Sequence, residues 1–247
     1  MNLPASGGMS SHFPAPPFTW IVICGMMSGL LRVIVLLMAS LSSLSGAPRL
    51  DVALSPGFTV EDALRASFGE TPRTVVLHGV NGAEAPHAVV QACRNEEGLF
   101  FVFHCSDRNV VSPGREDGLD HFRLGDTVEV FLGRRGEPGY VEIHATPAGK
   151  KSLYFFDGYR SRIAAPPEAG LVRVDSVMTQ GGWRAVMSVP WSVLGAREAG
   201  EEWEIFLGRY DYDAEGATPV LSSFPAQRGA KPDFHRRADY AALRFLP

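Results

Sequence analysis

The stretches Gly125-Asp-Thr-Val-Glu-Val-Phe-Leu132 and Tyr140-Val-Glu-Ile-His-Ala-Thr146 both alternate between apolar and polar side chains. Successive side chains of a β-strand point to opposite faces, so the alternation predicts two strands covered on one face by a hydrophobic core. Residues 133–139 between them are rich in glycine and arginine, which predicts a connecting loop. If the strands pair, the face opposite the core collects Glu129, Glu142 and His144. A solvated sheet surface shows the same pattern, so the alternation alone leaves a solvated face and a binding site open.

Working outward, the rest of the chain shows short strand patterns separated by turn residues. Leu99-Phe-Phe-Val-Phe103 is apolar without interruption, which is typical of a strand buried on both faces. Helix signals are confined to Val60–Phe68 and to a turn after Pro190. Many short strands with glycine and proline turns predict an all-β fold: an antiparallel β-sandwich with jelly-roll or immunoglobulin-like layers and few short helices. Further strands are predicted at Thr74–Val80, Ser152–Phe156, Leu171–Met178, Trp183–Val189, Trp203–Tyr212 and Tyr240–Phe245.

The composition narrows the class of protein. The 247 residues are 45% hydrophobic, which is too apolar for a disordered chain. The formal net charge of −4 gives no overall electrostatic reason to bind nucleic acid. The pairs Arg134-Arg135 and Arg236-Arg237 are far smaller than a nucleic-acid-binding patch. We therefore expect one globular domain that does not bind nucleic acid.

The first 47 residues differ from the rest, because they contain no acidic residue and a single basic one, Arg32. From Met27 the sequence shows a short basic segment, an apolar segment over 33–39, and small residues ending at Ala47. This order is typical of a signal peptide. We expect residues 1–47 to be a leader with a signal peptide starting at Met27, and residues 48–247 to be a secreted or periplasmic domain. The alternative is a leader retained as a membrane anchor.

Export makes disulfide bonds possible, so the cysteines need separate consideration. His87–Arg94 and Leu99–Cys105 read as a hairpin around Asn95-Glu-Glu-Gly98. If Arg94 pairs with Leu99, Cys93 faces Phe100, and Cys105 lies five residues farther along, about 17 Å away at about 3.3 Å per residue. A disulfide requires Cα atoms within about 7 Å. We therefore predict that Cys93 and Cys105 are free and buried.

Four segments in this order resemble a known family. They are Gly125-Asp-Thr-Val-Glu-Val-Phe131, Tyr140-Val-Glu-Ile-His-Ala-Thr-Pro147, the run Gly181–Gly195, and Phe234-His-Arg-Arg-Ala-Asp-Tyr-Ala-Ala-Leu-Arg-Phe245. The set is similar to the family 9 carbohydrate-binding modules and their relatives, over roughly residues 72–245. The resemblance implies a β-sandwich with a sugar slot on one face. In binding members of the family, two tryptophans enclose a sugar ring while polar side chains hold its hydroxyl groups.

The resemblance also implies a set of site residues in this chain. The first tryptophan position falls on Arg123, with Phe122 beside it, and the second falls on Phe234, so neither tryptophan is kept. Phe122 and Phe234 are left as the expected apolar walls. The polar, ligand-binding residues implied by the resemblance are Glu129, Glu142, His144, Arg209 and Asp211. A salt bridge from Arg209 to Glu129 or Glu142 is the structural alternative for that arginine.

Some members of the family hold structural calcium, and Asp107, Asp117 and Asp120 lie in a loop where oxygen ligands are able to collect. Calcium requires about six to eight oxygen ligands, and the spacing of these residues is not that of an EF-hand. We expect no other cofactor.

The function that the resemblance implies is non-catalytic binding of the end of a polysaccharide or oligosaccharide, alongside a separate glycoside hydrolase. Three alternatives stay open. The first is a structural domain of the cell envelope that has lost sugar binding. The second is a haem-binding sandwich, for which Met178, Met187 and His144 are available ligands. The third is a glycoside hydrolase that uses Glu129 and Glu142 as its carboxyl pair.

Overall fold

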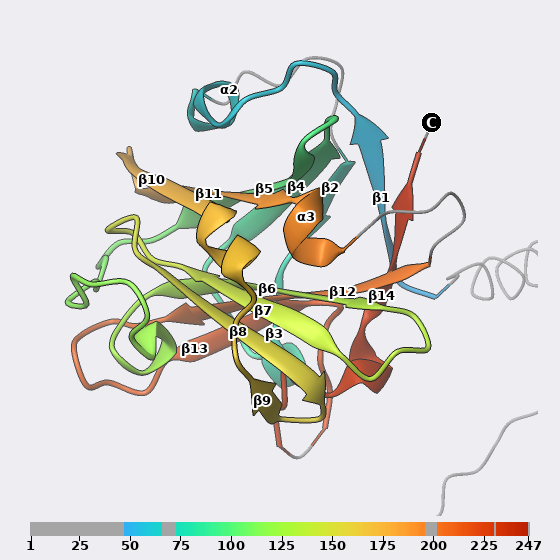
Figure 1. Ribbon diagram of the computed structural model, residues 1–247. Helices are drawn as coiled ribbons and strands as arrows, with labels where there is room; N and C mark the ends of the chain where they lie inside the picture. The colour runs from blue at the N-terminus through green and yellow to red at the C-terminus, as the bar shows by residue number, and fades with distance from the viewer. Residues whose placement is uncertain (1–46, 66–72, 196–201, 230, 247) are drawn as a thin grey trace, which may run out of the picture. The chain divides into compact units, whose positions relative to one another are not determined.

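The computed structural model describes residues 47–65, 73–195, 202–229 and 231–246. Two β-sheets face each other across a hydrophobic core (Figure 1). The first, called the β5 sheet here, has the order β10-β11-β5-β4-β2. Its strands are β2 (Arg73–Val76), β4 (Ala88–Arg94), β5 (Gly98–Ser106), β10 (Arg173–Thr179) and β11 (Gly182–Pro190).

The second sheet, called the β6 sheet, has the order β14-β12-β6-β7-β8-β9. Two further strands extend it, because β13 pairs with β12 and β3 pairs with β13. Its strands are β3 (His78–Gly79), β6 (Thr127–Arg134), β7 (Tyr140–Ala145), β8 (Lys151–Gly158), β9 (Ser161–Ile163), β12 (Trp203–Asp211), β13 (Val220–Phe224) and β14 (Ala241–Phe245). The prediction of an all-β sandwich is confirmed.

Strand β1 (Arg49–Leu54) connects the two sheets and supplies the parallel pairs of the described structure. Its first four residues pair in parallel with β14, and its last two residues pair in parallel with β4. Every other strand pair among the described residues is antiparallel. The sequence analysis did not predict β1, although Leu50 and Val52 alternate with the polar residues Arg49 and Asp51 and are buried in the core.

The helices are short. The α-helix α2 spans Val60–Leu64 and begins with a capping box, in which Thr59 and Asp62 exchange hydrogen bonds with each other's backbone amides. The α-helix α3 spans Trp191–Leu194 and follows Pro190, as predicted. The 3₁₀ segments are Val80–Gly82, His121–Arg123, Pro167–Leu171 and Arg237–Asp239. Of the predicted helix Val60–Phe68, residues 66–68 lie outside the described residues.

The core between the sheets is built from the apolar face of each strand. Val128, Val130 and Leu132 of β6 face Phe101 and Phe103 of β5, and all five side chains are almost fully buried. The tryptophans Trp183 and Trp203 belong to the same core. The alternation in the β6 and β7 sequences therefore predicted the inward face correctly.

Cys93 and Cys105 are both free and buried. Their hairpin has the predicted register, with Arg94 opposite Leu99 and Cys93 opposite Phe100. Burial raises the pKa of each thiol to about 12, so both stay protonated near neutral pH.

The predicted leader lies almost wholly outside the described residues, which begin at residue 47. Export and the signal peptide therefore stay predictions. None of the helices in the described part of the chain has the length and hydrophobicity needed to span a membrane.

Stability is expected to depend on the core more than on the sheet edges. Phe103→Ala removes a fully buried ring and should lower the free energy of unfolding by about 3–5 kcal/mol. Met178→Ala, on the exposed edge strand β10, should change it by less than about 0.5 kcal/mol. Urea denaturation followed by tryptophan fluorescence measures both. Equal effects of the two substitutions would contradict this assignment of the core.

Candidate functional site

The outer face of the β6 sheet is not a solvated surface. It carries a second cluster of buried side chains, which is mostly aromatic and includes Phe131, Tyr154, Phe206 and Phe234. In the middle of these rings lies a pocket of about 340 Å³, within the usual size range for a small-molecule site. We call this pocket the slot.

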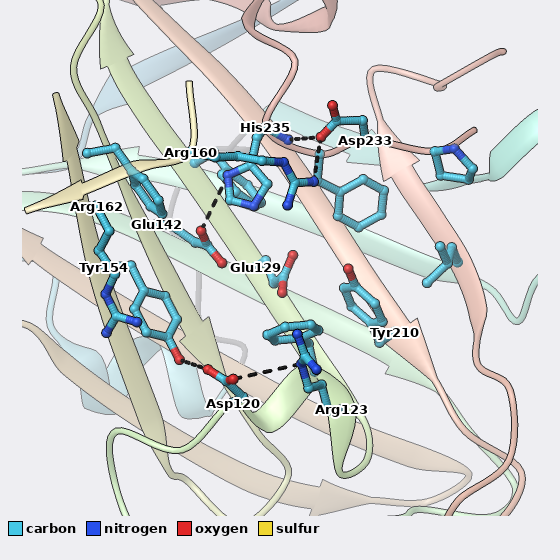
Figure 2. Close-up of a pocket in the computed structure, with 16 residues that line it drawn as sticks. Asp120, Arg123, Glu129, Glu142, Tyr154, Arg160, Arg162, Tyr210, Asp233 and His235 are labelled. Atoms are coloured by element: carbon cyan, nitrogen blue, oxygen red, sulfur yellow. Dashed lines mark hydrogen bonds and ion pairs between the residues drawn. The ribbon is translucent and has the colours of Figure 1, made fainter. Parts of the chain in front are cut away.

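Two carboxylates from neighbouring strands form the floor of the slot (Figure 2). Glu129 of β6 pairs across the sheet with His144 of β7, and Glu142 lies two residues before His144 on the same face. His144 Nε2 lies 2.5 Å from Glu142 Oε1 and 3.1 Å from Glu129 Oε1. The prediction that Glu129, Glu142 and His144 gather on one face of the sheet is therefore confirmed. His144 itself is fully buried behind the two carboxylates rather than in the slot wall.

Burial changes the protonation of this floor. It raises the pKa of Glu129 to about 8; His144 opposes this shift and Glu142 adds to it. For His144, burial disfavours the charged ring, but the two carboxylates outweigh burial and the pKa of the imidazole is raised. The raised pKa favours the protonated form of Glu129, and a protonated carboxyl group is able to donate as well as accept a hydrogen bond.

Three aromatic rings border the floor. Phe122 lies 5.6 Å and Phe234 lies 5.5 Å from the ring of Tyr210, measured between centroids. These three residues, called the aromatic border, come from a 3₁₀ segment, from the chain before β14, and from β12. The predicted walls Phe122 and Phe234 are thus both present, and Tyr210 joins them.

Gly208 makes room for this border. It lies opposite Glu129 in the β6–β12 register. A Cβ atom at this position would lie 2.7 Å from the Phe234 ring and 3.4 Å from a Glu129 carboxylate oxygen. A glycine is therefore needed for the ring of Phe234 to pack against β12 beside the carboxylate.

The opposite rim of the slot carries charged side chains that sequence reasoning did not select. Arg160 and Arg162 come from the β8–β9 hairpin, and Asp233 comes from the loop before β14. Arg160 lies in the left-handed backbone region with φ of 54°, although it is not glycine. Its guanidinium donates to Asp233 at 2.8 Å, and the Tyr159 hydroxyl donates to the same carboxylate at 2.6 Å. The positive φ and these contacts had no signal in the sequence.

Arg123 and Asp120 complete the rim at the 3₁₀ segment. Arg123 lines the slot as predicted, and it makes a loose ion pair of 3.7 Å with Asp120. The other oxygen of the Asp120 carboxylate accepts a hydrogen bond from the Tyr154 hydroxyl at 2.9 Å. His235, from the loop before β14, lines the slot beside Glu142.

The prediction that Arg209 and Asp211 lie at this site is wrong. Arg209 pairs with Val128 in the β6–β12 register, so its side chain shares the inner face with the hydrophobic core. It is fully buried, donates to Asp211, and crosses to the other sheet to reach the Ser106 carbonyl at 3.0 Å and Asp107 at 3.3 Å. The alternative of a salt bridge to Glu129 or Glu142 is also wrong, because the described ion pairs of Arg209 are with Asp107 and Asp211.

Asp107 is therefore part of an internal charged cluster with Arg209, Asp211 and Asp126. The predicted calcium residues are not brought together among the described residues. Asp117 accepts from the Lys151 backbone amide, while Asp120 binds Tyr154 at the slot. Asp107 instead offers a ligand atom within 4.8 Å of those of Asp126 and Asp211, and calcium binding stays a prediction.

The floor of the slot has a donor set that would suit a metal ion, since ligand atoms of Glu129, Glu142 and His144 all lie within 4.8 Å of one another. However, His144 Nδ1 is buried without a hydrogen-bond partner. A metal-bound imidazole normally donates its second ring N–H to an acceptor. The floor is accordingly better suited to sharing protons among three groups than to holding a metal.

Comparison with known proteins adds to this geometry. No protein-family model matches the chain, and no curated protein matches it. Solved structures do match. A protein from Bacteroides uniformis ATCC 8492, described as a candidate carbohydrate-binding protein, superposes with a TM-score of 0.67 at 17% identity, covering 81% of this chain and 100% of that one.

Two structures of a family 9 carbohydrate-binding module from Caldicellulosiruptor kristjanssonii also match. The complex with cellotriose gives a TM-score of 0.58 at 11% identity, covering 80% of this chain and 93% of that one. The complex with glucose gives 0.59 at 10% identity, covering 80% and 95%. The fold is that of these modules. The fold implied by the family 9 resemblance is thus confirmed, while the identity is too low to transfer a ligand.

The protonation of the floor makes stability depend on pH. Because the pKa of Glu129 is raised from 4.5 to about 8 on folding, the folded state binds this proton more tightly than the unfolded chain. The contribution is fully present below about pH 4.5 and is lost as the pH rises through about 8. We expect the melting temperature to fall between pH 5 and pH 9, and to fall less in Glu129→Gln.

Differential scanning calorimetry across this pH range tests the expectation. The control is Glu168→Gln, an exposed carboxylate in the 3₁₀ segment Pro167–Leu171. Asp126, whose pKa burial raises to about 7, keeps part of the pH dependence in every variant. An unchanged pH profile in Glu129→Gln would show that Glu129 is already ionised in the folded protein at pH 5.

Proposed function

We propose that the slot binds the end of an oligosaccharide or polysaccharide without catalysing a reaction. The observation that carries this proposal is a slot with aromatic sides and a polar, buried floor on the outer face of the β6 sheet. A sugar ring presents C–H groups to aromatic faces and hydroxyl groups to polar side chains, so it requires both surfaces at once. Structures with this fold include a module that binds cellotriose and glucose, which supports the same ligand class.

The hydrogen-bonding groups of the slot suit hydroxyl groups. The Tyr210 hydroxyl points into the slot toward Glu129 (Figure 2), and it has no hydrogen-bond partner among the described residues. Glu129 is able to donate and accept, and Glu142 accepts. Together, these three side chains donate and accept hydrogen bonds, as the neighbouring hydroxyl groups of a sugar ring also do.

A hydrolase is a weaker interpretation of the same carboxylates. Retaining and inverting enzymes place their two carboxyl groups about 5–9.5 Å apart on either side of the scissile bond. Here Glu129 and Glu142 contact the same His144 nitrogen from adjacent strands of one sheet. Both carboxylates therefore face a ligand from the same side, which favours holding the sugar over cleaving it.

The haem interpretation is also disfavoured. His144 lies beneath the slot, whereas Met187 is in the core of the β5 sheet and Met178 is on the edge strand of that sheet. These three candidate ligands thus belong to opposite sheets. An envelope domain without a ligand remains the alternative if no sugar binds. The proposed exported location rests on the leader pattern over residues 27–47.

Removing one wall should weaken sugar binding. We expect Phe234→Ala to lower the affinity of the purified protein for its best oligosaccharide about tenfold or more, because a buried aromatic wall is lost from the slot. Isothermal titration calorimetry against a panel of mono- and oligosaccharides measures the affinity, and chromatography of the same mixtures detects cleavage.

The matched control is Phe58→Ala, which removes a comparably buried ring from beneath α2 on the far side of the β5 sheet. It should cost stability and leave affinity unchanged. Failure of the folded parent to bind any sugar, or the release of shorter products, would overturn the proposal.

Removing one oxygen should have a smaller effect. Tyr210→Phe keeps the aromatic border and deletes a hydroxyl that has no partner among the described residues. The loss of one neutral hydrogen bond of about 0.5–1.5 kcal/mol predicts a two- to tenfold weaker affinity, with an unchanged melting temperature. Calorimetry and thermal denaturation of the same sample test it, and an unchanged affinity would place the sugar away from Tyr210.

A further inference from the structure

Arg162 is an exposed cation at the rim of the slot, and no described acidic side chain forms an ion pair with it. It lies in β9, whose three residues are all exposed, and it lines the slot. Its guanidinium stacks over the Tyr154 ring at 4.0 Å from the centroid. Within the described residues it makes no side-chain hydrogen bond and no ion pair.

The other charges of the slot are paired. Arg160 is bound to Asp233, where hydrogen bonds from Tyr159 and Arg160 outweigh burial and hold the pKa of the carboxyl below its usual value. Arg123 is the counterion of Asp120.

On the floor, the raised pKa of Glu129 favours its uncharged form. His144 Nε2 contacts both floor carboxylates, at 2.5 Å from Glu142 and 3.1 Å from Glu129. Arg162, at the exposed rim, is the charged side chain of the described slot lining that makes no ion pair.

The backbone holds this charge in place. Arg160 in the turn and Arg162 in β9 both line the slot. The turn is fixed by Arg160 in the left-handed region, and this residue is tied to the loop before β14 through Asp233. Positive φ is energetically unfavourable for a residue other than glycine. Such a strained backbone conformation is usually retained where the local geometry serves a functional site.

A guanidinium that stacks on an aromatic ring keeps its N–H groups free in the plane of the fork. Those N–H groups bind a carboxylate or a sulfate with two parallel hydrogen bonds. An uncharged sugar leaves this capacity unused, whereas a sugar with an anionic substituent on the ring that enters the slot satisfies it. The floor and the aromatic border then hold the hydroxyls and the ring of the same residue.

We propose that the slot prefers an acidic sugar, with the carboxylate of a uronic acid or a sulfate ester bound by Arg162 at the rim. This inference rests on the proposed function and specifies its ligand class. The neutral sugar is the reference, because it makes the same floor and wall contacts and lacks the anionic group.

Pairs of ligands that differ in one group test the preference. We would titrate the full-length protein with glucose, glucuronate and glucose 6-sulfate, and with cellobiose and its uronic acid counterpart, in low salt. We expect the best acidic ligand to bind about 10- to 100-fold tighter than its neutral counterpart, since one charge-assisted pair of hydrogen bonds is gained. The preference should shrink as salt is added. The stronger of glucuronate and glucose 6-sulfate identifies the anionic group.

The decisive variant is Arg162→Gln, which should abolish the preference for the acidic ligand, so that the acidic and neutral members of each pair bind with equal affinity. Arg173→Gln, at an exposed position in β10 of the other sheet, is the matched control and should change neither affinity. Equal affinity for neutral and acidic ligands, or an acidic preference that survives Arg162→Gln, would overturn the inference and leave the proposed function standing. If no sugar of either kind binds to the folded protein, both proposals fail.

Discussion

Strands β6 and β7 are buried on both faces, and the two faces carry different chemistry. One face of β6 supplies Val128, Val130 and Leu132 to the core between the sheets. The other face supplies Glu129 and Phe131 to the slot. Because side chains alternate strictly along a strand, the packing that fixes the core also fixes the position of the carboxylates. A slip of one residue in this pair would place Glu129 in the core.

The buried carboxylates require the groups around them. A charged carboxylate away from water is costly unless it is paired or neutralised. Here His144 lies between Glu129 and Glu142, and the three groups share their protons so that little net charge is buried. The floor is therefore a polar surface that the aromatic cluster is able to surround. The same arrangement leaves the charge at the rim, on Arg162, without a partner among the described residues.

The error at Arg209 shows where sequence reasoning about β12 failed. Both faces of this strand read as apolar, with Ile205 and Leu207 on one and Phe206 and Tyr210 on the other. Alternation thus gave no means of deciding which face joins the slot. The register with β6 decides it, because Gly208 lies opposite Glu129 and Arg209 lies opposite Val128. Gly208 and Tyr210 therefore share the outer face, where Tyr210 lines the slot, and Arg209 lies between the sheets.

The sequence by itself determined the all-β sandwich, the inward faces of β6 and β7, the register of the β4–β5 hairpin, and the gathering of Glu129, Glu142 and His144. Each of these follows from local alternation or from a short hairpin, so neighbouring residues carry the information. Only the tertiary structure decided the rest of the slot. Arg162 comes from the short strand β9, Asp233 from a loop that precedes the last strand, and Asp120 from the residue before the 3₁₀ segment His121–Arg123. Their approach depends on contacts between segments far apart in the chain, and no local pattern of side chains encodes such contacts.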